Sequence, residues 1–264
     1  MLKLTNVKKT FNRGTVTEKR ALTGVDLTLA DGDFVTVIGG NGAGKSTLLN
    51  MIAGVYPIDS GVIELDGKDI SRLSESARAR YLGRVFQDPM RGTAADMWIE
   101  ENLALARRRG QRRGLAWGIS SQEREEYPGL LASLDLGLEN RMRAKVGLLS
   151  GGQRQALTLL MATLTDPRVL LLDEHTAALD PKTASKVLAL TKELVESRGL
   201  TTIMVTHNMN DAIRLGNRLI MMHEGSIIYD VSGAEKAALT VSELLQKFEE
   251  VSGGELANDR MLLG

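Results

Sequence analysis

The stretch Phe34-Val-Thr-Val-Ile-Gly-Gly-Asn-Gly-Ala-Gly-Lys-Ser46 runs from a continuously apolar segment into a glycine-rich loop. The apolar part, 34–38, predicts a buried strand, and the residues from Lys45 to Ala53 have helical spacing. The loop between them has the pattern G, four residues, G-K-S, which is typical of phosphate binding. A flexible turn before a lysine is the alternative, but the flanking strand and helix argue against it.

Glycines let successive backbone N–H groups turn toward phosphate oxygens, because no Cβ atom stands in the way. These amides open a helix, where the helix dipole also favours an anion. We expect Lys45 to reach the β- and γ-phosphates, Thr47 to bond the α-phosphate, and the Ser46 hydroxyl to ligate Mg²⁺. The predicted contacts of this loop with ATP are Gly39, Asn41, Gly42, Ala43, Gly44, Lys45, Ser46 and Thr47.

A second apolar strand, Val169-Leu-Leu-Leu-Asp-Glu174, ends in two carboxylates. Carboxylates at the C-terminal ends of parallel strands lie at the crevice where such sheets bind ligands. We expect Asp173 to hold the Mg²⁺ shell and Glu174 to orient or deprotonate the attacking water. An isolated acidic pair is as often a solvated loop, but the phosphate loop upstream favours the catalytic interpretation.

The composition limits the possible functions. The 264 residues contain no cysteine, which excludes disulfides, cysteine zinc sites and a thiol nucleophile. The 33 basic and 33 acidic residues cancel, so no overall field recruits nucleic acid or an anionic membrane. No apolar segment suggests a signal peptide, and no window approaches the roughly 18 unbroken apolar residues of a membrane span. We expect a cytosolic or peripheral protein.

The remaining pattern alternates strands and helices, which predicts an α/β fold with a largely parallel sheet. Expected strands are Leu2–Val7 and Val25–Ala30, which alternate as antiparallel strands do, with 61–65, 84–86, 169–172, 201–205 and a hairpin of 217–222 with 226–231. Expected helices are Ser74–Tyr81, Pro181–Glu196 with Asp180 as N-cap, and 241–250. Between about 88 and 165 only helices are expected, at 100–108, 121–134 and 152–164.

The pentapeptide Leu149-Ser-Gly-Gly-Gln153 resembles the signature motif of ABC transporter ATPases. Three further motifs are similar to that family in order: Gln87 after Val85-Phe, Asp180 in Ala178-Leu-Asp, and His207 after Val205-Thr. The resemblance covers roughly residues 2–231. It implies a phosphate-loop NTPase with a RecA-like core, an antiparallel β subdomain and a helical signature subdomain.

The resemblance also implies roles for these residues. Two cassettes would face each other as a homodimer, so that Ser150, Gly151, Gly152 and Gln153 of one chain cover the γ-phosphate held by the other. Gln87 would contact Mg²⁺ or the attacking water. His207 would contact the γ-phosphate and act with Glu174, and Asp180 would lie at the dimer seam. Phe11 is the candidate for stacking on adenine, with simple core packing as the alternative.

Two positions depart from the family pattern. The family usually has proline where this chain has His175, and serine where it has Ala177. We expect His175 and His223 to be structural. The catalytic groups are retained, so the departures bear on the geometry of the dimer seam.

In this family a helix of a membrane subunit docks beside the loop that contains Gln87, which we call the glutamine loop. Here Pro89–Leu105 would line the docking groove, with Met90, Met97, Trp98 and Ile99 as apolar contacts. Alternatively, these residues form the core of the helical insert, 88–165, itself. The five arginines within Arg107–Arg113 are expected to form a solvated face, or alternatively to contact anionic lipid.

The resemblance implies an ATPase subunit on the cytoplasmic face of a membrane, working with permease subunits and an extracytoplasmic solute-binding protein. An importer of amino-acid type is favoured, and an exporter of the lipoprotein-release or macrolide-efflux type is the alternative. A third class, ATPases of DNA repair or translation, is disfavoured because no nucleic-acid footprint is visible. We expect one domain over 1–250, with its core and β subdomain in 1–87 and 166–231, a helical subdomain in 88–165, and a C-terminal helix and tail in 232–264.

Overall fold

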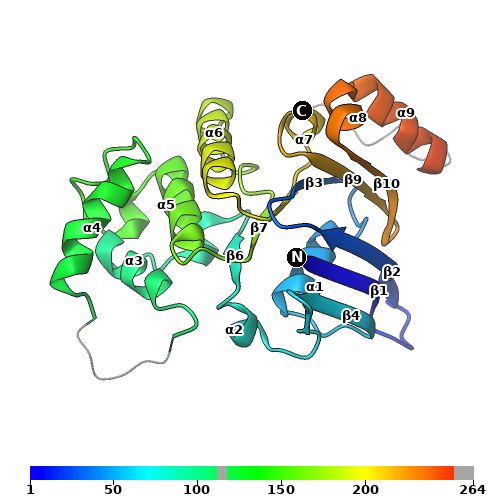
Figure 1. Cartoon of the computed structure of the whole chain (residues 1–264), viewed down its shortest axis with the longest axis horizontal. Helices are drawn as coiled ribbons and strands as arrows, with labels where there is room; N and C mark the ends of the chain where they lie inside the picture. The colour runs from blue at the N-terminus through cyan, green and yellow to red at the C-terminus, as the bar shows by residue number, and fades with distance from the viewer. Residues whose placement is uncertain (112–117, 253–264) are drawn as a thin grey trace. The chain divides into compact units, whose positions relative to one another are not determined.

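The computed structural model describes residues 1–111 and 118–252. They divide into two compact units, one formed by Met1–Arg78 with the chain from Gly199 onward, the other by Ala79–Arg198 (Figure 1). We call them the first and the second unit and describe each by itself.

The first unit contains an antiparallel sheet in the order β2-β1-β4-β5. Its strands are β1 (Leu2–Phe11), β2 (Lys19–Leu29), β4 (Ser60–Leu65) and β5 (Lys68–Asp69). Leu2, Leu4 and Val7 of β1 are buried and alternate with exposed residues, as the sequence pattern predicts. The antiparallel strands expected at Leu2–Val7 and Val25–Ala30 are confirmed as β1 and β2.

The first unit also contains a mostly parallel group of strands in the order β10-β9-β3-β8. Strand β3 (Phe34–Ile38) is buried throughout and pairs in parallel with β8 (Thr202–Val205) and β9 (Arg218–His223). The hairpin partner β10 (Ser226–Ser232) is antiparallel to β9, and Glu224-Gly225 turns with positive φ angles, as expected. Strand β3 and its following helix α1 (Lys45–Ala53) have the predicted bounds.

Short helices complete the first unit: α2 (Glu75–Arg78), α7 (Met209–Arg214), α8 (Gly233–Ala238) and α9 (Val241–Ser252). Leu244 and Phe248 lie one turn apart on α9 and are buried against Ile38, Leu219 and Met221. The C-terminal helix therefore packs on the strand that leads into the phosphate loop.

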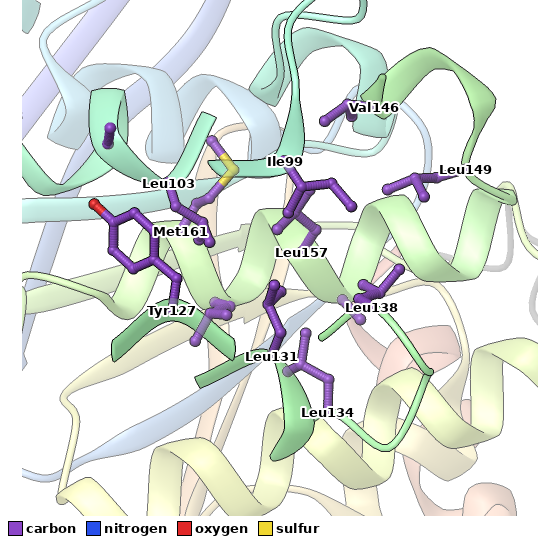
Figure 2. Close-up of a cluster of buried hydrophobic side chains, with 13 residues drawn as sticks. Ile99, Leu103, Tyr127, Leu131, Leu134, Leu138, Val146, Leu149, Leu157 and Met161 are labelled. Carbon is purple, nitrogen blue, oxygen red and sulfur yellow. The ribbon is translucent and has the colours of Figure 1, made fainter. Parts of the chain in front are cut away.

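The second unit has two parallel strands, β6 (Leu82–Val85) and β7 (Val169–Asp173). Its helices are η1 (Pro89–Gly92), α3 (Ile99–Arg107), α4 (Ser121–Ala132), η2 (Val146–Leu148), α5 (Gly151–Thr163) and α6 (Pro181–Arg198). Figure 2 shows the apolar core that α3, α4 and α5 share, with Ile99, Leu131 and Leu157 among its members. Among the described residues of 88–165 no strand forms, apart from one bridge between Trp98 and Lys145.

The helix expected over Ser74–Tyr81 is wrong in extent, because only Glu75–Arg78 is helical. The Arg78 side chain turns inward, is 1% exposed, and donates to the carbonyl oxygens of Met51, Ile52, Leu73 and Ser71. Tyr81 accepts at its carbonyl oxygen from the Arg168 and Val169 amides, so the chain there already runs toward strand β6. Tertiary hydrogen bonds thus end the helix early.

The described arginines of the cluster are partly exposed, and each of them binds the protein. Arg107 forms a bidentate ion pair with Glu126, and Arg108 binds Glu123. Arg109 donates to the Ala162 carbonyl and the Thr165 hydroxyl. Arg112 and Arg113 lie outside the described residues. No helix in the described part of the chain is long and apolar enough to cross a membrane.

Candidate functional site

The glycine-rich loop has a backbone that requires its glycines. Gly39, Gly42 and Gly44 have φ values of 149°, 81° and 103°. A Cβ atom on Gly39 would collide with the carbonyl oxygen of Met222, so only glycine fits there. Helix α1 follows with Gly44 as its N-cap and with no side chain capping it. Its first amides are therefore not used by a capping side chain and suit an anion.

Lys45 is 8% exposed, and its ammonium folds back over the loop. Nζ donates to the carbonyl oxygens of Gly39 and Gly40 at 2.6 and 3.0 Å. These bonds hold a positive charge at the mouth of the loop. Ser46 is exposed and Thr47 is half-buried, while Asn41 and Gly42 are exposed and Ala43 is buried.

Phe11 ends β1 and is half-buried. Its ring meets the ring of Tyr56 edge to face, with centroids 5.2 Å apart, and the Lys9 ammonium lies 5.5 Å from its centroid. The ring is therefore held by neighbours while part of it stays accessible. Tyr56 was not predicted as part of this environment, because it is 45 residues from Phe11 in the sequence.

His207 lies shortly after the end of β8 and is exposed. The next residue, Asn208, caps α7 by accepting from the Asp211 amide at 3.1 Å. A rigid strand and a capped helix thus flank the histidine on both sides. Phe11, the phosphate loop and His207 all belong to the first unit.

The second unit carries the acidic residues. Strands β6 and β7 are parallel and Val85 pairs with Leu172, so Gln87 and Asp173 follow the same edge of this strand pair. Arg84 Nη2 lies 3.8 Å from Asp173 Oδ2, with both side chains largely buried. The sequence predicted no role for Arg84 at the site, because its position indicates only that it belongs to a strand. It places a positive charge beside the carboxylate expected to serve the metal.

Glu174 follows in the left-handed region, with φ of 46°. This conformation is uncommon for residues other than glycine. The next side chain, His175, is 2% exposed, and burial lowers its pKa to about 4. The histidine is therefore uncharged at neutral pH. Gln87 is exposed, and the preceding Phe86 carbonyl accepts from Gln155 Nε2 at 3.1 Å.

The signature segment starts helix α5 with a reciprocal cap. Ser150 Oγ accepts from the Gln153 amide at 3.3 Å, and Gln153 Oε1 accepts from the Ser150 amide at 3.2 Å. Gly151 is exposed, whereas Gly152 is buried, and a Cβ atom at Gly152 would collide with Thr183 of α6. Asp180 caps α6 by accepting from the Thr183 amide at 3.1 Å, as expected.

A family model described as ABC transporter matches residues 22–177. The chain belongs to the ABC transporter family. The matched region contains the phosphate loop, the glutamine at 87, the signature and the acidic strand end. As a cassette of this family, the chain binds ATP and hydrolyses it.

The cassette is 45% identical over 249 residues to a tyrosine transport ATP-binding protein of Clostridioides difficile, covering 94% of this chain and 99% of that protein. It is 36% identical to a methionine import ATP-binding protein of Rhizobium johnstonii over 86% of this chain, but spans only 60% of that protein. A dimeric ATP-binding cassette solved in a post-hydrolysis state with ADP and Pi superposes with a TM-score of 0.75 at 31% identity, over 88% of this chain and 98% of the other. The predicted α/β phosphate-loop fold is confirmed.

Proposed function

We propose that this cassette is the ATP-hydrolysing subunit of a membrane importer for a small polar solute of amino-acid type. The observation that carries the proposal is the similarity to a tyrosine transport ATP-binding protein over nearly the full length of both chains.

In this proposal the loop amides from Gly39 to Ser46 hold the phosphates, because the loop leads into the N-terminus of α1 and Gly39, Gly42 and Gly44 have positive φ angles. Lys45 exchanges its two loop carbonyls for the β- and γ-phosphate oxygens. Thr47 contacts the α-phosphate, and the accessible part of the Phe11 ring stacks on adenine.

The donor set fits Mg²⁺, which prefers hard oxygen ligands. The Ser46 hydroxyl, the Gln87 amide oxygen and the Asp173 carboxylate are all of this kind. When bound, the ion would supply positive charge that offsets the negative charge of the phosphates. The Arg84 guanidinium, 3.8 Å from the Asp173 carboxylate, would help to orient it.

Glu174 orients or deprotonates the attacking water, and His207 contacts the γ-phosphate. Ser150, Gly151, Gly152 and Gln153 act in trans, on the nucleotide held by a second copy of the chain, and Asp180 lies at the seam. The exposure of Ser150 and Gly151 at the start of α5 supports this role, as does the dimeric state of the similar cassette. A two-fold dimer then contains two equivalent composite sites.

The proposed partners are transmembrane permease subunits and an extracytoplasmic solute-binding protein, with the cassette on the cytoplasmic face of the membrane. Met90 and Trp98 are 43% and 40% exposed, which supports their use as permease contacts. Ile99 is fully buried in the core of the insert, so the expectation of a permease contact there is wrong. We retain 88–165 as the helical subdomain, 1–87 with 166–231 as core and β subdomain, and 232–264 as C-terminal helix and tail, of which 112–117 and 253–264 lie outside the described residues.

Uptake of isotopically labelled amino acids tests the proposal in the native host after deletion of the gene. Wild-type protein should restore uptake of at least one amino acid, whereas Lys45→Ala should not. Lys68→Ala, an exposed change on β5 far in sequence from every proposed site residue, is the matched control and should restore it. Unchanged uptake in the deletion strain, or restored efflux in place of uptake, would contradict the import role.

A further inference from the structure

His175, the residue after Glu174, is hydrogen-bonded to helix α6. Glu174 has φ of 46°, in the left-handed region, which costs a residue that carries a Cβ atom some free energy. Such a conformation persists only where the surrounding structure holds it. The segment from 174 to 179 closes on itself through the Ala177 amide to the Glu174 carbonyl, 3.0 Å, and the Leu179 amide to the Thr176 carbonyl, 3.1 Å.

His175 ties this segment to helix α6. Its ring is 2% exposed, and Nε2 lies 3.0 Å from Oγ1 of Thr191, which is fully buried on α6. The direction of the bond follows from chemistry. Thr191 Oγ1 already donates its single hydrogen to the Val187 carbonyl at 2.8 Å, so it must accept from His175. The imidazole therefore carries a proton on Nε2.

In this chain of hydrogen bonds each donor and each acceptor is defined. It runs from the Val187 carbonyl through the Thr191 hydroxyl to the ring of His175, and the ring is one peptide bond from Glu174. A proline in place of the histidine could fill space there but could not donate such a bond. The backbone next to Glu174 is therefore fixed to the body of α6 by a side-chain hydrogen bond in addition to packing.

We propose that His175 is a positioning residue, whose hydrogen bond to Thr191 sets the place of the Glu174 carboxylate for attack by water. The inference rests on the proposed role of Glu174. It assigns no contact between His175 and the nucleotide. It predicts an effect on the chemical step and none on ATP binding.

Two substitutions at Thr191 separate positioning from packing. Thr191→Val keeps the shape of the side chain and removes the hydroxyl, and Thr191→Ser removes a buried methyl group and keeps the hydroxyl. Both changes lower stability, so a purely structural role predicts similar effects of the two on turnover. The matched control is Thr163→Val, because Thr163 is also fully buried and its hydroxyl bonds only to carbonyls of its own helix, at Leu159 and Leu160.

The measurement is steady-state ATP hydrolysis by the full-length chain, with kcat and KM determined separately and the melting temperature recorded for each variant. Thr191→Val should lower kcat by about tenfold with an unchanged KM, as expected when a reacting group is displaced by a fraction of an ångström. Thr191→Ser and Thr163→Val should stay within about twofold of wild type.

Three results would overturn the inference. If Thr191→Val keeps wild-type kcat while Glu174→Gln loses turnover, the bond is only structural and the proposed function stands. If Glu174→Gln itself keeps wild-type turnover, the role proposed for Glu174 fails and the inference fails with it. Equal losses of kcat in Thr191→Val and Thr191→Ser would assign the effect to packing.

Discussion

Gln155 on α5 donates a hydrogen bond from Nε2 to the backbone carbonyl of Phe86 over 3.1 Å, and Phe86 directly precedes Gln87. Helix α5 begins at the signature residues, so one fully buried side chain joins the signature helix to the glutamine loop. Thr158, one turn further along α5, packs close to Gly92 of η1. The same face of α5 therefore holds both ends of the segment that leads from the strand to the insert.

Replacement of Gln155 by leucine should lower the free energy of unfolding by about 1 to 3 kcal/mol, because the Phe86 carbonyl loses its buried donor. Turnover should fall as well, since Gln87 is no longer held in place. Gln122→Leu, on the exposed face of α4, is the control and should change neither quantity. Urea unfolding and ATPase assays check this; normal turnover in destabilised Gln155→Leu would show that the bond does not serve Gln87.

Glu123 should make stability depend on acid pH. Burial opposes ionisation of its carboxylate, but hydrogen bonds from Arg108, Ser120 and Tyr127 outweigh burial and lower its pKa from 4.5 to about 2. The folded-state pKa lies below the unfolded value, so the stabilisation is fully present above pH 4.5 and is lost as the pH falls toward about 2. Its upper bound is about 3 kcal/mol, at about 1.4 kcal/mol per pKa unit.

Glu123→Gln should remove this pH dependence and lower stability at neutral pH. Glu125→Gln, exposed on the same helix, should leave the dependence unchanged. Free energies of unfolding at pH 7, 5 and about 3 decide the matter. A wild-type slope that survives in Glu123→Gln would place the titrating group elsewhere.

The arginines at the end of α3 should differ in their contribution to stability. Arg109 donates two partly buried hydrogen bonds at the end of α5, so Arg109→Gln should cost about 1 to 3 kcal/mol. Arg107 pairs with Glu126 at a site about one third exposed, and Arg107→Gln should cost at most about 1 kcal/mol. Since both guanidinium groups bind protein, association with anionic vesicles should be unaffected; a loss of vesicle binding in either variant would restore the lipid-contact hypothesis.

Much of the fold is predictable where local signals act alone. The buried strand Phe34–Ile38 and the helix from Lys45 to Ala53 have the predicted bounds, because apolar runs and helical spacing are sufficient there. Helix α6 was expected to end near Glu196 and ends at Arg198, whose side chain donates to the Thr163 carbonyl. Helices α7 and α8 were missed because six residues are too few to show a period.

The site could be predicted only as far as its motifs reach. Residues that act on the nucleotide carry their own pattern, as at Lys45 and Glu174. Residues that hold the nucleotide-binding residues in place carry no such motif, because their partners are distant in sequence. Arg84 lies near Asp173, Gln155 binds the Phe86 carbonyl, and His175 binds Thr191. A lone histidine next to a catalytic glutamate showed only a departure from the family pattern, and its hydrogen bond gives that departure a physical meaning.

Mixing two inactive variants tests most directly whether the phosphate loop of one chain works with the signature of another. Lys45→Ala disables the loop and Ser150→Phe disables the signature, so each variant alone should lack turnover. In a mixed dimer one composite site carries both changes and the other carries neither. Equal mixing makes half of the dimers mixed, with one intact site of two, so turnover should recover to about a quarter of wild type. Turnover that stays at the level of the separate variants would contradict the account.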